Sequence, residues 1–121
     1  METNHLITGI EVKDILKTDV PCMNIERSNE ANLFKIIDGF ADYTINLIKK
    51  GNLTGIKNCF NTAERLLSDG SSDVKLAIEN IFVFSVTIFF DMGNAVSGQV
   101  KELLPSNLME EYHKQVSSCQ P

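Results

Sequence analysis

The sequence predicts an all-α fold, a compact bundle of four to five helices in which neighbouring helices form HEAT-like helix-turn-helix pairs. Between Ser28 and Asp91, apolar residues recur at steps of three and four, which is the period of an amphipathic helix. Gly51 and Gly70 divide this stretch into segments of helical length. The chain has 121 residues, 43% of them apolar, which is enough for one domain with a buried core.

Residues 1–27 are expected to be a weakly structured N-terminal segment. Val12, Ile15 and Leu16 could form a short amphipathic turn, but Pro21 lacks the backbone N–H that a continuing helix needs. A helical domain is therefore predicted over residues 28–117, and a polar tail over residues 118–121.

The first predicted helix begins at Ser28, a good N-cap residue, and ends at Gly51, which can adopt the left-handed conformation of a helix stop. Lys49 and Lys50 place positive charge at its C-terminal end, where the helix dipole favours cations. One face is apolar except for Thr44; it comprises Leu33, Ile36, Ile37, Phe40, Thr44, Leu47 and Ile48.

The second predicted helix begins after Asn52, which can cap it, and ends at Gly70. Its apolar residues form one stripe along the helix, as expected for a helix with one buried face. They are Leu53, Ile56, Phe60, Ala63, Leu66 and Leu67.

The third predicted helix spans residues 73–91 and is apolar on nearly every side. Such a helix must be covered by neighbours on several sides, so it is expected to be the centre of the domain. A fourth, shorter segment ends at Pro105, and Ser106 caps a last helix.

Charge and cysteine content exclude several classes of protein. Sixteen acidic and 11 basic residues give a net charge of -5, which disfavours nucleic-acid binding and favours a basic partner. Cys22, Cys59 and Cys119 are odd in number and form no CxxC pair, so a reducing cytoplasm is expected and neither a disulfide framework nor a zinc site is indicated.

The N-terminus lacks the pattern of an export signal. The most apolar stretch, Ile81 to Phe90, is too short to span a membrane, which takes about 20 residues.

No catalytic constellation is recognisable, so we expect no enzyme, no cofactor and no metal. Glu110 and His113 stand three residues apart, like half of a di-iron site, but the second copy is missing and His5 has no such partner. Cys59 lies beside the apolar stripe of its helix and is expected to be a buried, unreactive thiol. The glycines match neither phosphate-binding pattern.

Asp38 and Asp42 are the candidate partner-binding residues. They are four residues apart on the polar face of the first long helix, where like charges destabilise the helix by about 0.2–0.5 kcal/mol. Two interpretations remain open: a solvated face softened by Lys35, or part of an acidic surface that meets a cationic partner.

Three segments carry a resemblance to a known group of proteins. They are the run Phe40–Gly51, the turn Ala63–Gly70 and the apolar helix Val74–Phe90. This pattern resembles small, uncharacterised all-helical bacterial proteins, some of which are similar in size and acidity to immunity proteins of toxin systems. The resemblance implies an all-helical fold and an inhibitor that binds one cognate toxin.

We therefore expect a cytoplasmic, non-enzymatic bacterial protein that binds and neutralises a basic toxin domain through an acidic helical surface. Two alternatives remain: a self-associating structural or adaptor module, and a bundle that binds a small molecule in its phenylalanine-rich interior.

Overall fold

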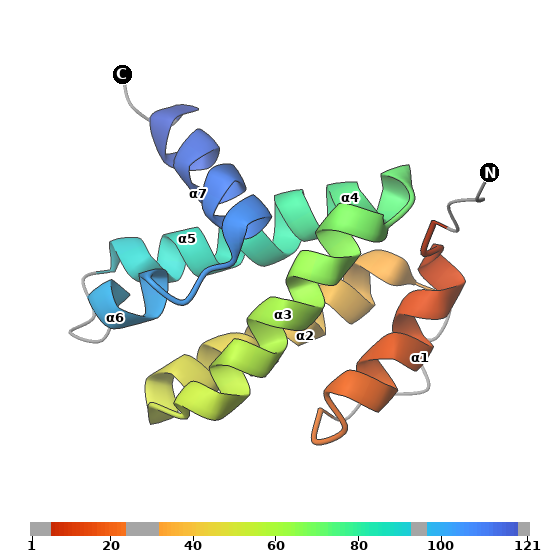
Figure 1. Cartoon of the computed structure of the whole chain (residues 1–121), viewed down its shortest axis with the longest axis horizontal. Coiled ribbons are helices and arrows are strands. Elements are labelled where there is room, and N and C mark those ends of the chain that lie inside the picture. The colour runs from red at the N-terminus through yellow and green to blue at the C-terminus, as the bar shows by residue number, and fades with distance from the viewer. Residues whose placement is uncertain (1–5, 24–31, 93–96, 119–121) are drawn as a thin grey trace.

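Helices account for every regular element in residues 6–23, 32–92 and 97–118, which are the residues that the computed structural model describes (Figure 1). The all-α prediction is therefore confirmed. The elements are α1 (Gly9–Asp19), α2 (Leu33–Lys50), α3 (Leu53–Asp69), α4 (Ser72–Ala77), the π-helical segment η2 (Ile78–Val83), α5 (Phe84–Asp91), α6 (Ser97–Lys101) and α7 (Ser106–Ser118).

The segment expected to be weakly structured, residues 1–27, contains α1, and this differs from the prediction. Val12 and Leu16 are fully buried, because these residues, one helical turn apart, pack against α2 and α3. Glu11 accepts a hydrogen bond from the backbone N–H of Thr8 at 2.9 Å, which satisfies the start of the helix. At the other end, the Asn58 side chain of α3 donates to the Asp19 carbonyl at 2.6 Å. The N-terminal helix is thus part of the bundle.

Helices α2 and α3 form the predicted pair around Gly51. Gly51 has φ 73°, the left-handed conformation that glycine adopts without strain, and the next residue, Asn52, caps α3 by accepting from the Gly55 N–H at 3.0 Å. The predicted cap of the first long helix, Ser28, lies outside the described residues. In the structure α2 begins at Leu33, and its N-cap is Asn32, whose side chain accepts from the Lys35 N–H at 3.2 Å.

One continuous helix, made of α4, η2 and α5, crosses the domain as predicted for residues 73–91. It contacts α2, α3 and α7 along its length (Figure 1). Phe82 and Phe89 are buried, 1% and 6% exposed, so its central position is confirmed. Neighbours cover it on several sides, as predicted, and leave one side open. Phe84 and Ile88 are about half exposed, because α2, α3 and α7 pack on its inner side.

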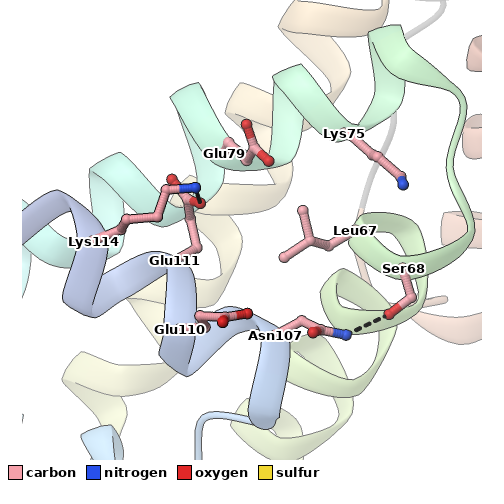
Figure 2. A pocket seen from close by; sticks show the side chains of 8 residues that line it. All are labelled: Leu67, Ser68, Lys75, Glu79, Asn107, Glu110, Glu111 and Lys114. Carbon is pink, nitrogen blue, oxygen red and sulfur yellow. Dashed lines mark hydrogen bonds and ion pairs between the residues drawn. The ribbon is translucent and has the colours of Figure 1, made fainter.

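The predicted C-terminal helix is present as α7; it begins at Ser106 itself, which was expected to be the cap before it, and it is held by α3. The Glu64 carboxylate accepts from the N–H groups of Asn107 and Leu108 at 3.1 and 3.0 Å, so a residue of α3 satisfies the first free donors of α7. The Asn107 amide also donates to the Ser68 hydroxyl at 2.8 Å (Figure 2). Helix α7 runs to Ser118, and the remainder of the expected tail lies outside the described residues.

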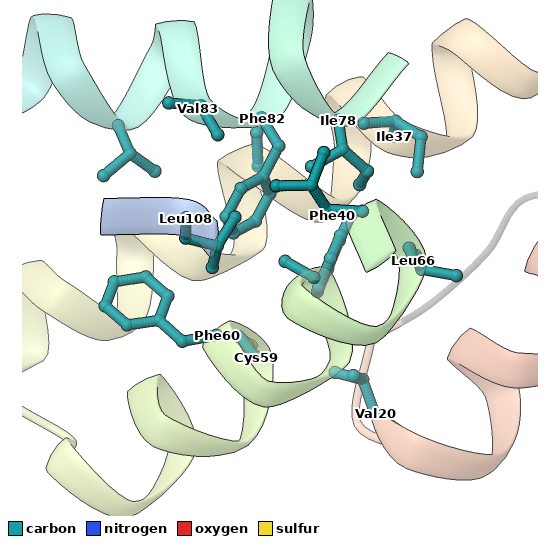
Figure 3. Close-up of a cluster of buried hydrophobic side chains, with 14 of the residues drawn as sticks. Val20, Ile37, Phe40, Cys59, Phe60, Leu66, Ile78, Phe82, Val83 and Leu108 are labelled. Atoms are coloured by element: carbon teal, nitrogen blue, oxygen red, sulfur yellow. The ribbon is translucent and has the colours of Figure 1, made fainter. Parts of the chain in front are cut away.

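The core lies where α2, α3 and the central helix meet (Figure 3). Phe40 of α2 and Phe60 of α3 are both fully buried and face Phe82 of η2. The Phe60 and Phe82 rings are 6.4 Å apart at 83°, an edge-to-face arrangement that aromatic pairs prefer. Leu108 of α7 closes this cluster from the other side, so one apolar core joins the N-terminal and C-terminal helices.

Candidate binding surface

The predicted pair Asp38 and Asp42 lies on the outer face of α2. Both side chains are exposed, and neither forms an ion pair or a hydrogen bond with another described residue. Phe34 lies one turn before Asp38 on the same face and is half exposed. The face therefore combines two unpaired negative charges with an aromatic side chain that the core does not cover.

A second exposed surface follows the central helix and was missed by the sequence analysis. Leu76, Phe84, Ile88 and Met92 are exposed by 48%, 50%, 46% and 72%. We call these four residues the outer stripe. The signal that could have found them is the i, i+4, i+8 spacing of Phe84, Ile88 and Met92, which places them on one side of the helix. Exposed apolar residues gathered on one face indicate an interaction surface, whereas scattered ones do not.

The residues considered for metal binding are not brought into a site. Glu110 and His113 are both exposed on α7. Across the described ranges, no group of three or more His, Cys, Asp or Glu residues could hold a metal ion. His5 lies outside those ranges. Nor is any helix there long and apolar enough to span a bilayer.

Two of the three cysteines line one pocket of about 240 Å³ between α1, α2 and α3, which also holds Tyr43. Cys59 is buried, as predicted, and Cys22 is exposed, while Cys119 lies outside the described residues. Burial raises the pKa of the Cys59 thiol, and a hydrogen bond with Thr44 lowers it in part. Burial raises the pKa of Tyr43 as well, and the two thiols add to this shift. No positive side chain lines the pocket, so nothing there stabilises a reactive thiolate.

An open, polar pocket of about 350 Å³ lies between α3, α7 and the central helix (Figure 2). Charges of both signs surround it: Lys75 and Glu79 on the central helix, and Glu110, Glu111 and Lys114 on α7. Glu111 is paired with Lys114 at 3.6 Å. Because positive and negative side chains are mixed around the pocket, their electrostatic potentials partly cancel, and the pocket does not strongly favour either anions or cations.

One space in the apolar interior among the described residues is very small. The space beside Thr87, lined by Phe82, Leu104, Leu108 and Tyr112 among others, has a volume of only about 10 Å³. A single water needs roughly 10–15 Å³ of such volume. This space therefore has no room for an organic ligand.

Fold and surface define a small, acidic, all-helical domain with exposed apolar and acidic side chains. The chain belongs to the family described as "Domain of unknown function (DUF7674)", whose profile matches residues 13–118. No curated protein and no solved structure matches it. The match begins within α1, in agreement with the packing of that helix against the bundle.

Proposed function

We propose that the protein is a non-enzymatic binding domain that recognises a basic protein partner through the outer face of α2. The observation that carries this proposal is the exposed, unpaired pair Asp38 and Asp42 next to half-exposed Phe34. Carboxylates without an internal partner lose no existing ion pair when a cationic surface approaches. The net charge of -5 extends the attraction over longer range and increases the rate of encounter.

The partner we favour is a basic toxin domain, which would make this chain an immunity protein of a bacterial cytoplasm. Support for this proposal comes from the small size, the acidity and the resemblance to all-helical proteins of that kind. The inhibitor would act by covering the partner's functional surface, a role that needs no catalytic residue in the inhibitor. Steered association then makes inhibition fast.

A self-associating module is the second candidate, because the outer stripe is an apolar surface that another copy of the chain could cover. The two candidates differ in stoichiometry and in the charge of what is bound. A 1:1 complex with a basic protein supports the first, and a dimer formed by the purified chain alone supports the second.

The test begins with affinity purification of the tagged chain from the cells in which it occurs. We expect one basic protein in stoichiometric amount, which is then purified and titrated against the chain by calorimetry. A neighbouring coding region for a small toxin domain would identify the same protein independently. The binding role is wrong if no purified protein forms a complex and the chain instead turns over a substrate or retains a small molecule.

A further inference from the structure

We propose that the outer stripe is the docking site for an amphipathic, basic helix of the partner. This inference rests on the proposed function, because it names the part of a basic partner that the chain recognises. It adds a second surface to the acidic pair on α2 and assigns the apolar component of binding to Leu76, Phe84, Ile88 and Met92. An amphipathic helix that lays its apolar face along such a surface is a recurrent mode of recognition.

The π-helical segment η2 brings Leu76 toward the side of the helix that carries Phe84, with exposed Asn80 between them. Leu76 and Phe84 are eight positions apart. In an ideal α-helix, eight positions correspond to a rotation that leaves the two side chains about 80° apart around the helix axis. The i→i+5 hydrogen bonds of η2 accommodate about one extra residue in the turn, which removes about 100° of rotation and leaves the two side chains about 20° apart. Segments of this kind occur frequently at functional sites.

Acidic residues lie at both ends of the stripe. Asp73 precedes Leu76 by three residues, and Asp91 follows Ile88 by three, so each is on the same side of the helix as its apolar neighbour. Both are exposed, and neither is paired with another described residue. Lys75, in contrast, lines the polar pocket beside α7 and not the stripe (Figure 2).

The acidic pair on α2 is a separate surface, which adds to the negative charge of the protein at longer range. Helix α2 packs along η2 and α5, with Phe40 against Phe82. Asp38 lies two positions before Phe40, or about 160° around the helix, so it is on the outer face of α2 and not on the side that meets the central helix.

The charges select a basic partner over a second copy of the chain. Two copies packed antiparallel would bring Asp73 of each against Asp91 of the other, and two parallel copies would place each aspartate against its equivalent. Like charges in such positions oppose association. Lys or Arg residues flanking the apolar face of a partner helix would instead meet these carboxylates. Leu76 and Met92 are 16 positions apart, a length of about 24 Å, so a helix of four to five turns would cover the stripe.

The test uses synthetic peptides as probes. An 18-residue fluorescent peptide of leucine and lysine, with leucine at helical spacing, is compared with a scrambled peptide of the same composition and with a leucine–glutamate version. We expect the amphipathic lysine peptide to bind and the other two to bind at least about tenfold more weakly. In NMR spectra of the labelled chain, the shifted amides should cluster on the central helix between residues 73 and 92.

Variants then locate the site. Phe84→Ser with Ile88→Ser should weaken peptide binding about tenfold, whereas Leu53→Ser, an equally exposed apolar residue on α3, should change it less than about twofold. Asp73→Lys with Asp91→Lys should weaken the lysine peptide and strengthen the glutamate peptide. Circular dichroism confirms that each variant is folded.

Three results would overturn the inference. The first is that the scrambled peptide binds as tightly as the amphipathic one, and the second is that the Phe84 and Ile88 substitutions leave peptide binding unchanged. The third is that the purified chain forms a dimer that these substitutions dissociate. The first two leave the proposed function standing if the purified partner binds and depends on Asp38 and Asp42. A failure of the proposed function is recognised separately, by the absence of any purified protein partner.

Discussion

Phe40 of α2 and Phe82 of η2 stack with their ring centroids 4.8 Å apart and their planes inclined by 30°. Both side chains are fully buried, and the contact joins the first long helix to the central one. Because Phe82 also meets Phe60, its side chain connects three helices, and its removal leaves a cavity that none of them can close alone.

Replacing Phe82 or Phe89 by alanine should reduce the free energy of unfolding by about 3–5 kcal/mol in each case, because a large buried side chain is deleted. Phe84→Ala on the same helix is the matched control and should cost less than about 1 kcal/mol, since Phe84 is half exposed. Urea unfolding followed by circular dichroism measures all three. Losses under about 1 kcal/mol at both buried positions would show that this helix is not central.

The sequence was sufficient to predict α2, α3, the central helix and α7, because each shows helical periodicity and has cap or stop residues near its ends. Gly51 and Asn52 illustrate this. Gly51 adopts the left-handed conformation that ends α2, and the Asn52 side chain caps the start of α3. Helix α1 was predicted only as a possible short turn, because the burial of Val12 and Leu16 depends on packing against α2 and α3. Local propensity does not report such long-range packing.

The candidate surface was predicted only in part. Asp38 and Asp42 were found from their spacing, and both are exposed. The outer stripe was not found, because Phe84 and Ile88 carry the same apolar signal as buried Phe82 and Phe89. Which apolar side of the helix is covered depends on where α2 and α7 pack. The π-helical segment, which aligns Leu76 with Phe84, has no signature in the sequence that we recognise.

Gly70 and Gly98 should respond oppositely to alanine. A Cβ atom on Gly70 would lie 2.3 Å from the Leu66 carbonyl oxygen and 2.6 Å from a Val74 methyl group, so the turn between α3 and α4 must shift. We expect Gly70→Ala to destabilise the protein by about 1–3 kcal/mol. Gly98, in α6, has nothing within 4 Å of such an atom, and Gly98→Ala should stabilise by up to about 1 kcal/mol. Thermal unfolding distinguishes the two; equal effects would contradict the packing at Gly70.

Cys22 and Cys59 should differ strongly in reactivity, although they line the same pocket. Cys22 is exposed, whereas Cys59 is buried and its thiol pKa is raised by burial. A short pulse of iodoacetamide at pH 8, followed by peptide mapping, should label Cys22 and leave Cys59 unlabelled until the protein is unfolded in guanidinium. Similar labelling of both thiols in the native protein would show that Cys59 is accessible.

The raised pKa values of Cys59 and Tyr43 also predict weaker folding at alkaline pH. Each group keeps its proton in the folded state at pH values where it would lose it in the unfolded chain. Their contribution to stability is therefore complete below the unfolded pKa, 9.0 for the thiol, and is lost as the pH rises through the higher folded value. Urea unfolding between pH 7 and 11 should show this decrease above about pH 9. A stability that is constant or rising over this range would contradict it.

Charge reversal at Asp38 and Asp42 should slow association with the basic partner and leave folding nearly unchanged, because both side chains are exposed and unpaired. We expect the on-rate of Asp38→Lys/Asp42→Lys, measured by stopped flow, to fall several-fold more than that of Asp14→Lys/Glu102→Lys. The control makes the same change in net charge at exposed sites on α1 and after α6. For the unmodified chain, the on-rate should fall several-fold between low and physiological salt, because the Debye length shortens from about 30 Å at 0.01 M to about 8 Å at 0.15 M. Equal slowing by the two double variants would mean that only net charge matters and that the α2 face is not the contact. Slowing confined to the Asp38 and Asp42 variant would place the partner's cationic surface against α2.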